Sequence, residues 1–115
     1  METDKDVEAY RGRMNDPTAA ALLTGPCGDT MEFYLVVQED TITEAKFYTD
    51  GCDNTRSCGM AVARRALGRK VTDALSISAG EIIRSGECEP FEGRHCAILA
   101  VSTLYRAIAD YLLKP

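Results

Sequence analysis

The sequence predicts an α+β fold in which a small antiparallel β-sheet packs against helices. Residues 30–49 alternate apolar and polar side chains on both sides of a short polar turn, which is the pattern of a β-hairpin with one buried face. Apolar residues recur at spacings of three and four over residues 94–113, which predicts a long C-terminal helix. Because the strand patterns precede the helical patterns instead of alternating with them, an α+β arrangement is favoured over a parallel α/β one.

Length and charge exclude several classes of protein. The 115 residues have the size of one domain, so we expect a single domain over residues 1–115. The formal net charge of −5 argues against a nucleic-acid-binding protein, which normally carries a basic patch. The first residues are polar and do not form a secretory signal, and no apolar run approaches the roughly 20 residues that span a bilayer. We therefore expect a cytoplasmic protein with no membrane attachment.

The hairpin and the segments before it follow from side-chain alternation and helical spacing. Strands are predicted over Thr30–Val37 and Thr43–Thr49, while Ile42 is out of phase and indicates a β-bulge or a late strand start. Thr18–Leu23 fits either a third strand or a loop. Asp4–Met14 has apolar residues at helical spacing and predicts a short N-terminal helix. The side chains expected on the inner face of the hairpin are Met31, Phe33, Leu35, Val37, Ala45 and Phe47.

Capping signals divide the second half of the chain into helices. Asn54 or Thr55 can cap a helix that ends near Leu67 at Gly68. Further helices are predicted over 72–77, over 81–85 with a Ser78–Glu81 capping box, and over 94–113. The apolar stripe expected on the last helix consists of Ile98, Val101, Tyr105, Ile108 and Leu112.

The cysteines carry the chemical signal. There are five, an odd number, and in a reducing compartment separated thiols more often bind metal than form disulfides, although any one of them can be a small buried apolar residue. A hairpin turn centred between Glu39 and Asp40 places Cys27 opposite Cys52, with a shift of one residue if a bulge forms near Ile42.

Further candidates surround these two thiols. Asp29 follows two residues after Cys27 and can either reach the same site or serve as a turn aspartate. Cys96 and Cys58 fall near predicted helix N-termini, where the helix dipole stabilises thiolates. His95, the only histidine, adjoins Cys96, and no Cys-x-x-Cys pair is present. Single cysteines accompanied by a carboxylate and an imidazole indicate an open, mixed-ligand site that suits a cluster which must form and leave.

These residues occur in motifs that resemble a known family. Gly25–Asp29 (GPCGD), Ile42–Cys52 (ITEAKFYTDGC) and His95–Ala100 (HCAILA) closely resemble IscU/NifU-type iron–sulfur cluster assembly scaffolds, of the NifU N-terminal domain kind. The resemblance covers residues 24–114 and implies an IscU/SufE-like α+β fold. It implies a scaffold and not an enzyme, either monomeric or homodimeric.

The resemblance also implies roles for individual residues. Cys27, Cys52 and Cys96 would bind iron and sulfide as a nascent [2Fe-2S] cluster, with zinc as an alternative occupant of the apo-site. Asp29 would tune iron entry and cluster release, and His95 would be an alternative ligand. Cys96 would accept persulfide sulfur from a cysteine desulfurase, and recipient iron–sulfur apo-proteins would take the finished cluster.

Some features depart from the family pattern. Cys58 is either a fourth ligand or a packed helix residue, and we favour packing; Cys88 belongs to no family motif, so we expect no role for it. Residues 89–94 lack the Leu-Pro-Pro-Val-Lys segment that a dedicated Hsp70 chaperone recognises, which places that partner in doubt. The alternative function is a zinc-containing, SufU-like sulfur-transfer protein. Such relatives carry an insertion between the second and third cysteines and lack the histidine before the third, whereas residues 52–96 look uninserted and His95 is present. A purely structural zinc domain is the weakest hypothesis, because such sites are closed by four ligands.

Overall fold

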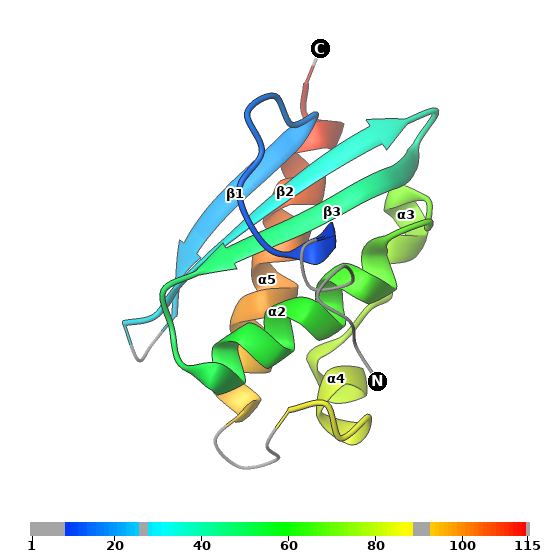
Figure 1. The fold of residues 1–115 in the computed structure, drawn as a ribbon. Coiled ribbons are helices and arrows are strands. Elements are labelled where there is room, and N and C mark those ends of the chain that lie inside the picture. The colour runs from blue at the N-terminus through cyan, green and yellow to red at the C-terminus, as the bar shows by residue number, and fades with distance from the viewer. Residues whose placement is uncertain (1–8, 26–27, 89–92, 115) are drawn as a thin grey trace.

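A three-stranded antiparallel sheet with helices packed against it forms the body of the protein. The computed structural model of the chain describes residues 9–25, 28–88 and 93–114. The strands lie side by side in the order β1-β2-β3. In chain order the elements are β1 (Ala19–Thr24), β2 (Thr30–Gln38), β3 (Thr41–Thr49), α2 (Asp53–Ala66), α3 (Val71–Ala74), α4 (Ala79–Arg84) and α5 (Gly93–Leu112). Figure 1 shows the long helix α5 running behind the sheet, with α2 beside it. The predicted α+β class is confirmed, and the segment that fitted either a strand or a loop is strand β1.

The hairpin of β2 and β3 contains the bulge that the sequence indicates. Val37 pairs with Ile42 but Val36 pairs with Glu44, so Thr43 is the extra residue on β3. Glu39 and Asp40 both have positive φ, as a tight two-residue hairpin turn requires. From the bulge to the open end of the hairpin, each β2 residue pairs with a β3 residue one position later than in a hairpin without the bulge. The predicted placement of Cys27 opposite Cys52 involves a residue, Cys27, that lies outside the described ranges.

The inner face of the sheet forms the core with α2 and α5. All six side chains predicted for that face are buried, and Phe33 and Phe47 are in ring contact. α5 packs against β1 and β2, and α2 packs against β3. The close approach of α2 depends on Gly59, because a Cβ atom there would lie 2.5 Å from Cδ2 of Phe47. This packing brings the N-terminal end of α2 beside that of α5.

The N-terminal helix prediction is wrong beyond residue 10. Residues 4–8 lie outside the described part, residues 9 and 10 are helical, and Arg11 instead forms a parallel bridge with Phe47. The backbone N–H of Gly12, whose φ is +119°, donates to the carbonyl of Phe47. The unpaired edge of β3 therefore competes successfully with a short helix for these backbone groups.

Most helix boundaries agree with the capping signals. The side chain of Ser78 accepts a hydrogen bond from the N–H of Glu81, as the capping box predicts, and Gly68 follows α2 with φ of +86°. Neither Asn54 nor Thr55 caps α2, because Cys52 occupies the N-cap position and the helix begins at Asp53. The predicted helix over residues 72–77 is shorter and begins at Val71.

Helix α5 has the predicted extent but a rotated apolar face. Val101 and Ile108 are buried, whereas Ile98 and Leu112 are 52% and 51% exposed, so the predicted stripe is wrong at both ends. In place of Ile98 and Leu112, alanines of α5 face the sheet and α2, because small side chains let the backbones approach closely. The buried apolar residues of α5 are Ala97, Leu99, Ala100, Val101, Leu104, Ala107 and Ile108. None of the helices within the described ranges combines the length and apolar character that crossing a membrane would require.

Candidate metal centre

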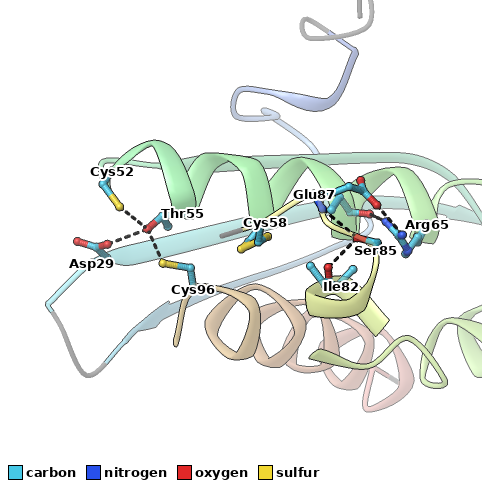
Figure 2. Close-up of a disulfide and its surroundings, with 11 residues drawn as sticks. Asp29, Cys52, Thr55, Cys58, Arg65, Ile82, Ser85, Glu87 and Cys96 are labelled. Atoms are coloured by element: carbon cyan, nitrogen blue, oxygen red, sulfur yellow. Dashed lines mark hydrogen bonds and ion pairs between the residues drawn. A yellow bond between two sulfur atoms is a disulfide. The ribbon is translucent and has the colours of Figure 1, made fainter. Parts of the chain in front are cut away.

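Three side chains from separate segments meet at one end of the molecule. They are the carboxylate of Asp29 and the thiols of Cys52 and Cys96, and their potential ligand atoms all lie within 4.8 Å of one another. Figure 2 shows the three side chains pointing toward a common centre. Cys52 is exposed, while Asp29 and Cys96 are partly buried. The group is therefore open to solvent on the side of Cys52.

Local structure explains how each side chain reaches this point. Asp29 lies just before β2, in a turn where Gly28 has φ of +87° and the N–H of Gly25 donates to the carbonyl of Asp29. Cys52 is the N-cap residue of α2, and Cys96 lies in the first turn of α5. Because α2 and α5 pack side by side, both thiols are held near helix N-termini, where partial positive charge favours anionic ligands.

The hydroxyl of Thr55 lies at the middle of this group. Thr55 Oγ1 donates to Oδ2 of Asp29 at 2.8 Å and lies 3.3 Å from Sγ of Cys96 and 3.5 Å from Sγ of Cys52. Its side chain is fully buried beneath the three ligand candidates. Figure 2 draws all three contacts as dashed lines that converge on this one oxygen atom.

The two thiols differ in acidity. Hydrogen bonds from the Thr55 side chain and then from its backbone N–H lower the pKa of Cys52 below the ordinary cysteine value. Burial raises the pKa of Cys96, and the nearby Cys52 and Asp29 raise it further, although the Thr55 hydroxyl opposes them. We expected helix N-termini to favour the thiolates of Cys96 and Cys58. At Cys96 the pKa moves in the opposite direction, because loss of solvent is the larger effect, and Cys58 lies in a disulfide.

The remaining predicted ligands are not part of this group as described. Cys27 lies outside the described residues. His95 is exposed, because successive residues of a helix point in different directions and its neighbour Cys96 is the one that faces α2. Cys58 is fully buried, which agrees with the packing hypothesis, and it forms a disulfide with Cys88. The expectation that Cys88 has no role is thus wrong: it links α2 to the segment before α5.

The sequence interpretation missed Thr55 as a member of the site and considered it only as a helix cap. Its signal was its position three residues after Cys52 at a predicted helix start, because residues three apart share one helix face. The convergence with Asp29 and Cys96 is tertiary, which no local pattern reveals.

Two thiols and a carboxylate form a donor set for a thiophilic metal. Thiolate and carboxylate ligands bind zinc at about 2.0–2.3 Å, and thiolates also hold iron–sulfur clusters. Ligand atoms within 4.8 Å of one another can surround one such ion after small side-chain adjustments. Because a closed structural zinc site needs four protein ligands, the three described donors leave at least one coordination position for another group.

The fold and this donor group together define an α+β domain with an open group of two thiols and a carboxylate that could hold a metal ion. The sequence model of the family described as "NifU-like N terminal domain" matches residues 8–115, and the chain belongs to this family.

Known proteins of similar sequence and fold bear related names. The iron-sulfur cluster assembly scaffold protein IscU 1 of Archaeoglobus fulgidus is 31% identical over 120 residues, which cover 99% of this chain and 78% of that protein. The crystal structure of a NifU-like protein (N-terminal) from Brucella abortus matches with a TM-score of 0.74 and 17% identity, covering 98% of this chain and 95% of that one. FiSufU from the thermophile Fervidobacterium islandicum, a candidate scaffold for the SUF system, matches with a TM-score of 0.67 and 15% identity over 93% and 96% of the two chains. At these identities the two structures show a shared fold alone.

Proposed function

We propose that this protein is an iron–sulfur cluster assembly scaffold that builds a [2Fe-2S] cluster and passes it to recipient apo-proteins. The observation that carries the proposal is the convergence of Asp29, Cys52 and Cys96 around one partly exposed centre. The name of the Archaeoglobus relative supports the same function. An incomplete thiolate set with one side open to solvent suits a cargo that is assembled and then released.

The cluster would be held by Cys52 and Cys96 together with Cys27, and Asp29 would bind iron as it enters and weaken the hold on the finished cluster. A carboxylate is a harder ligand than a thiolate, so its bond to iron exchanges more readily with an incoming thiol. His95 and Cys58 are secondary candidates for ligation. The exposure of His95 allows it to approach by a rotamer change, whereas Cys58 would first have to be released from its disulfide.

Sulfur would arrive as a persulfide on a cysteine desulfurase. In this step the Cys96 thiolate attacks the terminal sulfur of the persulfide, a new S–S bond forms, and the desulfurase cysteine leaves as a thiolate. Each sulfur transferred in this way must gain two electrons to become sulfide, so assembly also needs an external reductant. The pKa directions make Cys52 the competing acceptor, and trapping the persulfide followed by peptide mapping distinguishes the two thiols.

Anaerobic reconstitution tests the proposal. The reduced protein is incubated with ferrous iron, cysteine, a thiol reductant and a desulfurase, and the product is desalted. We expect sulfur-to-iron charge-transfer absorption in the visible range and about two irons and two sulfides per cluster. A colourless product without bound sulfide would refute the proposal.

Asp29→Ala tests the role given to the carboxylate. We expect the variant to assemble a cluster but to transfer it more slowly to an apo-ferredoxin, because an exchangeable oxygen ligand has been removed. Transfer is followed by the absorption or circular dichroism of the recipient. Equal transfer rates for the variant and the wild-type protein would remove this role from Asp29.

The second candidate function is a zinc-containing sulfur-transfer protein, as in the SufU-like alternative. The donor set of two thiols and a carboxylate favours it, because zinc accepts mixed sulfur and oxygen ligands in a site with one open position. In that case the purified protein would retain one zinc per chain and stay colourless after reconstitution. It would also accept sulfur from the desulfurase without forming a cluster.

A further inference from the structure

We propose that Thr55 is a positioning residue whose hydroxyl holds Asp29, Cys52 and Cys96 in a ligand-ready arrangement before metal enters. This inference rests on the proposed function, because it concerns how the same site binds metal. Thr55 itself would not touch the metal; it would act through the three side chains that do.

The contacts of a single oxygen atom carry the argument. Thr55 Oγ1 lies 2.8 Å from Asp29 Oδ2, 3.3 Å from Cys96 Sγ and 3.5 Å from Cys52 Sγ. A threonine hydroxyl has one proton to donate and two lone pairs to accept with. While both thiols are protonated, the hydroxyl donates to the Asp29 carboxylate and its two lone pairs can accept from the thiols; once a thiol ionises, the same proton can turn to that thiolate.

The three ligand candidates have no covalent tie that would keep them together. Asp29 belongs to the turn before β2, Cys52 to the start of α2 and Cys96 to the start of α5, so each could turn toward solvent independently. Thr55 is fixed where they are not: it is fully buried, it lies in the first turn of α2, and its branched Cβ restricts χ1. A rigid, buried hydroxyl that contacts all three side chains reduces the conformational entropy that these side chains must lose when metal binds.

Residues that orient metal ligands through hydrogen bonds have measurable effects on affinity. Their removal typically weakens metal binding about 10- to 100-fold. Thr55→Val keeps the branched shape and removes only the hydroxyl, whereas Thr55→Ser keeps the hydroxyl. Thr103→Val is the matched control, because Thr103 is also fully buried and its hydroxyl donates to the carbonyl of Leu99, with no ligand candidate involved.

The test is titration of the metal-free, reduced proteins with Co²⁺ under anaerobic conditions, followed by thiolate-to-cobalt absorption. We expect the dissociation constant for Co²⁺ to rise about 10- to 100-fold in Thr55→Val. Thr55→Ser and Thr103→Val should stay close to the wild-type value. Thermal unfolding of each metal-free variant shows whether a loss of affinity is separate from a loss of stability.

The outcomes separate this inference from the proposed function. If the wild-type protein binds no Co²⁺, the metal site fails and the inference fails with it. If the wild-type protein binds and Thr55→Val binds equally well, only the role of Thr55 is overturned. Should Thr55→Val not fold, Thr55→Ala and Thr55→Ser form a second pair that differs by one hydroxyl, and equal affinity in that pair overturns the proposal.

Discussion

Gly51→Ala should distort the candidate metal centre through one added methyl group. A Cβ atom at Gly51 would lie 2.8 Å from Oδ2 of Asp29 and 2.9 Å from Cβ of Thr55, whereas ordinary contact begins at 3.4 Å. The backbone of Gly51 cannot easily retreat, because its N–H donates to the hydroxyl of Thr49 and its carbonyl accepts from Arg56. The neighbours must therefore give way by at least about 0.5 Å.

The two neighbours differ in how easily they move. The Asp29 carboxylate is partly exposed and can swing outward, but Thr55 Cβ is attached to the backbone of α2 and can move only with the helix. Overpacking of this kind costs about 1–3 kcal/mol, and we expect the lower half of that range because one neighbour can relax. For a domain of this size such a loss lowers Tm by roughly 4–8 °C. A shift of 0.5 Å along the 2.8 Å bond between Thr55 and Asp29 also lengthens it beyond the usual O–H···O range, which ends at about 3.0 Å.

The assay compares Co²⁺ affinity and thermal unfolding of Gly51→Ala with those of Gly80→Ala. The control also adds a methyl group, but its Cβ would meet the flexible guanidinium of Arg84 at 3.0 Å, on a helix that contributes nothing to the site. We expect Gly51→Ala to bind Co²⁺ about 10- to 100-fold more weakly, because the hydrogen bond that orients Asp29 is lost. Gly80→Ala should keep wild-type affinity and gain up to about 1 kcal/mol from helix propensity. Wild-type affinity and Tm in Gly51→Ala would refute the close packing inferred around the site.

Three further predictions follow from the cysteines and from one buried carboxylate. Cys52→Ala should abolish a stable cluster on reconstitution while Cys88→Ala retains it, since the Cys88 sulfur lies in a disulfide outside the ligand group; equal cluster yields would contradict the assignment. In the metal-free protein at pH 7, iodoacetamide should modify Cys52 before Cys96, because Cys52 is exposed with a lowered pKa and burial raises the pKa of Cys96; peptide mass mapping after short exposures gives the order. Hydrogen bonding to Arg13 lowers the pKa of Glu32, so its stabilising contribution is present above the unfolded-state pKa of about 4.3 and is lost as pH falls through the lower folded value. Glu32→Gln should therefore show a weaker decrease in urea midpoint between pH 5 and pH 3 than wild type, and identical pH profiles would count against the pairing.

The hairpin was predictable in detail because its determinants are local. The alternation of apolar and polar residues predicted the buried face. Because Ile42 is out of phase with that alternation, it also indicated the bulge, which the pairings of Val36 with Glu44 and of Val37 with Ile42 confirm. The capping box at Ser78 is likewise a contact between residues three apart. The strand faces and the start of α4 depend on neighbours in the sequence, so they can be inferred from one chain alone.

The failures share a tertiary cause. Arg11 leaves the helical pattern because the edge of β3 offers a backbone partner far along the chain. Ile98 had the right spacing for the buried stripe, but alanines on the adjoining side of α5 allow closer packing and turn it outward. The pairing of Cys58 with Cys88 and the contacts of Thr55 are likewise set by helix packing. The candidate site could be predicted as a set of ligand types, whereas the residue at its centre could not.

Under the proposed function, the position of the donor group would let the protein load and unload cargo without losing its fold. The ligand candidates lie at the starts of elements, whereas the packed core lies between the middle of the sheet and the middles of α2 and α5, around Phe33, Phe47 and Leu104. Structural zinc sites that replace a core make folding depend on metal. Here none of the three ligand candidates is a buried core residue, although Cys96 packs against the core, so under the proposed function the exposed side of Cys52 would exchange cargo while the helices stay packed. The fully buried Thr55 connects that stable interior with the candidate site, because its hydroxyl contacts all three ligand candidates.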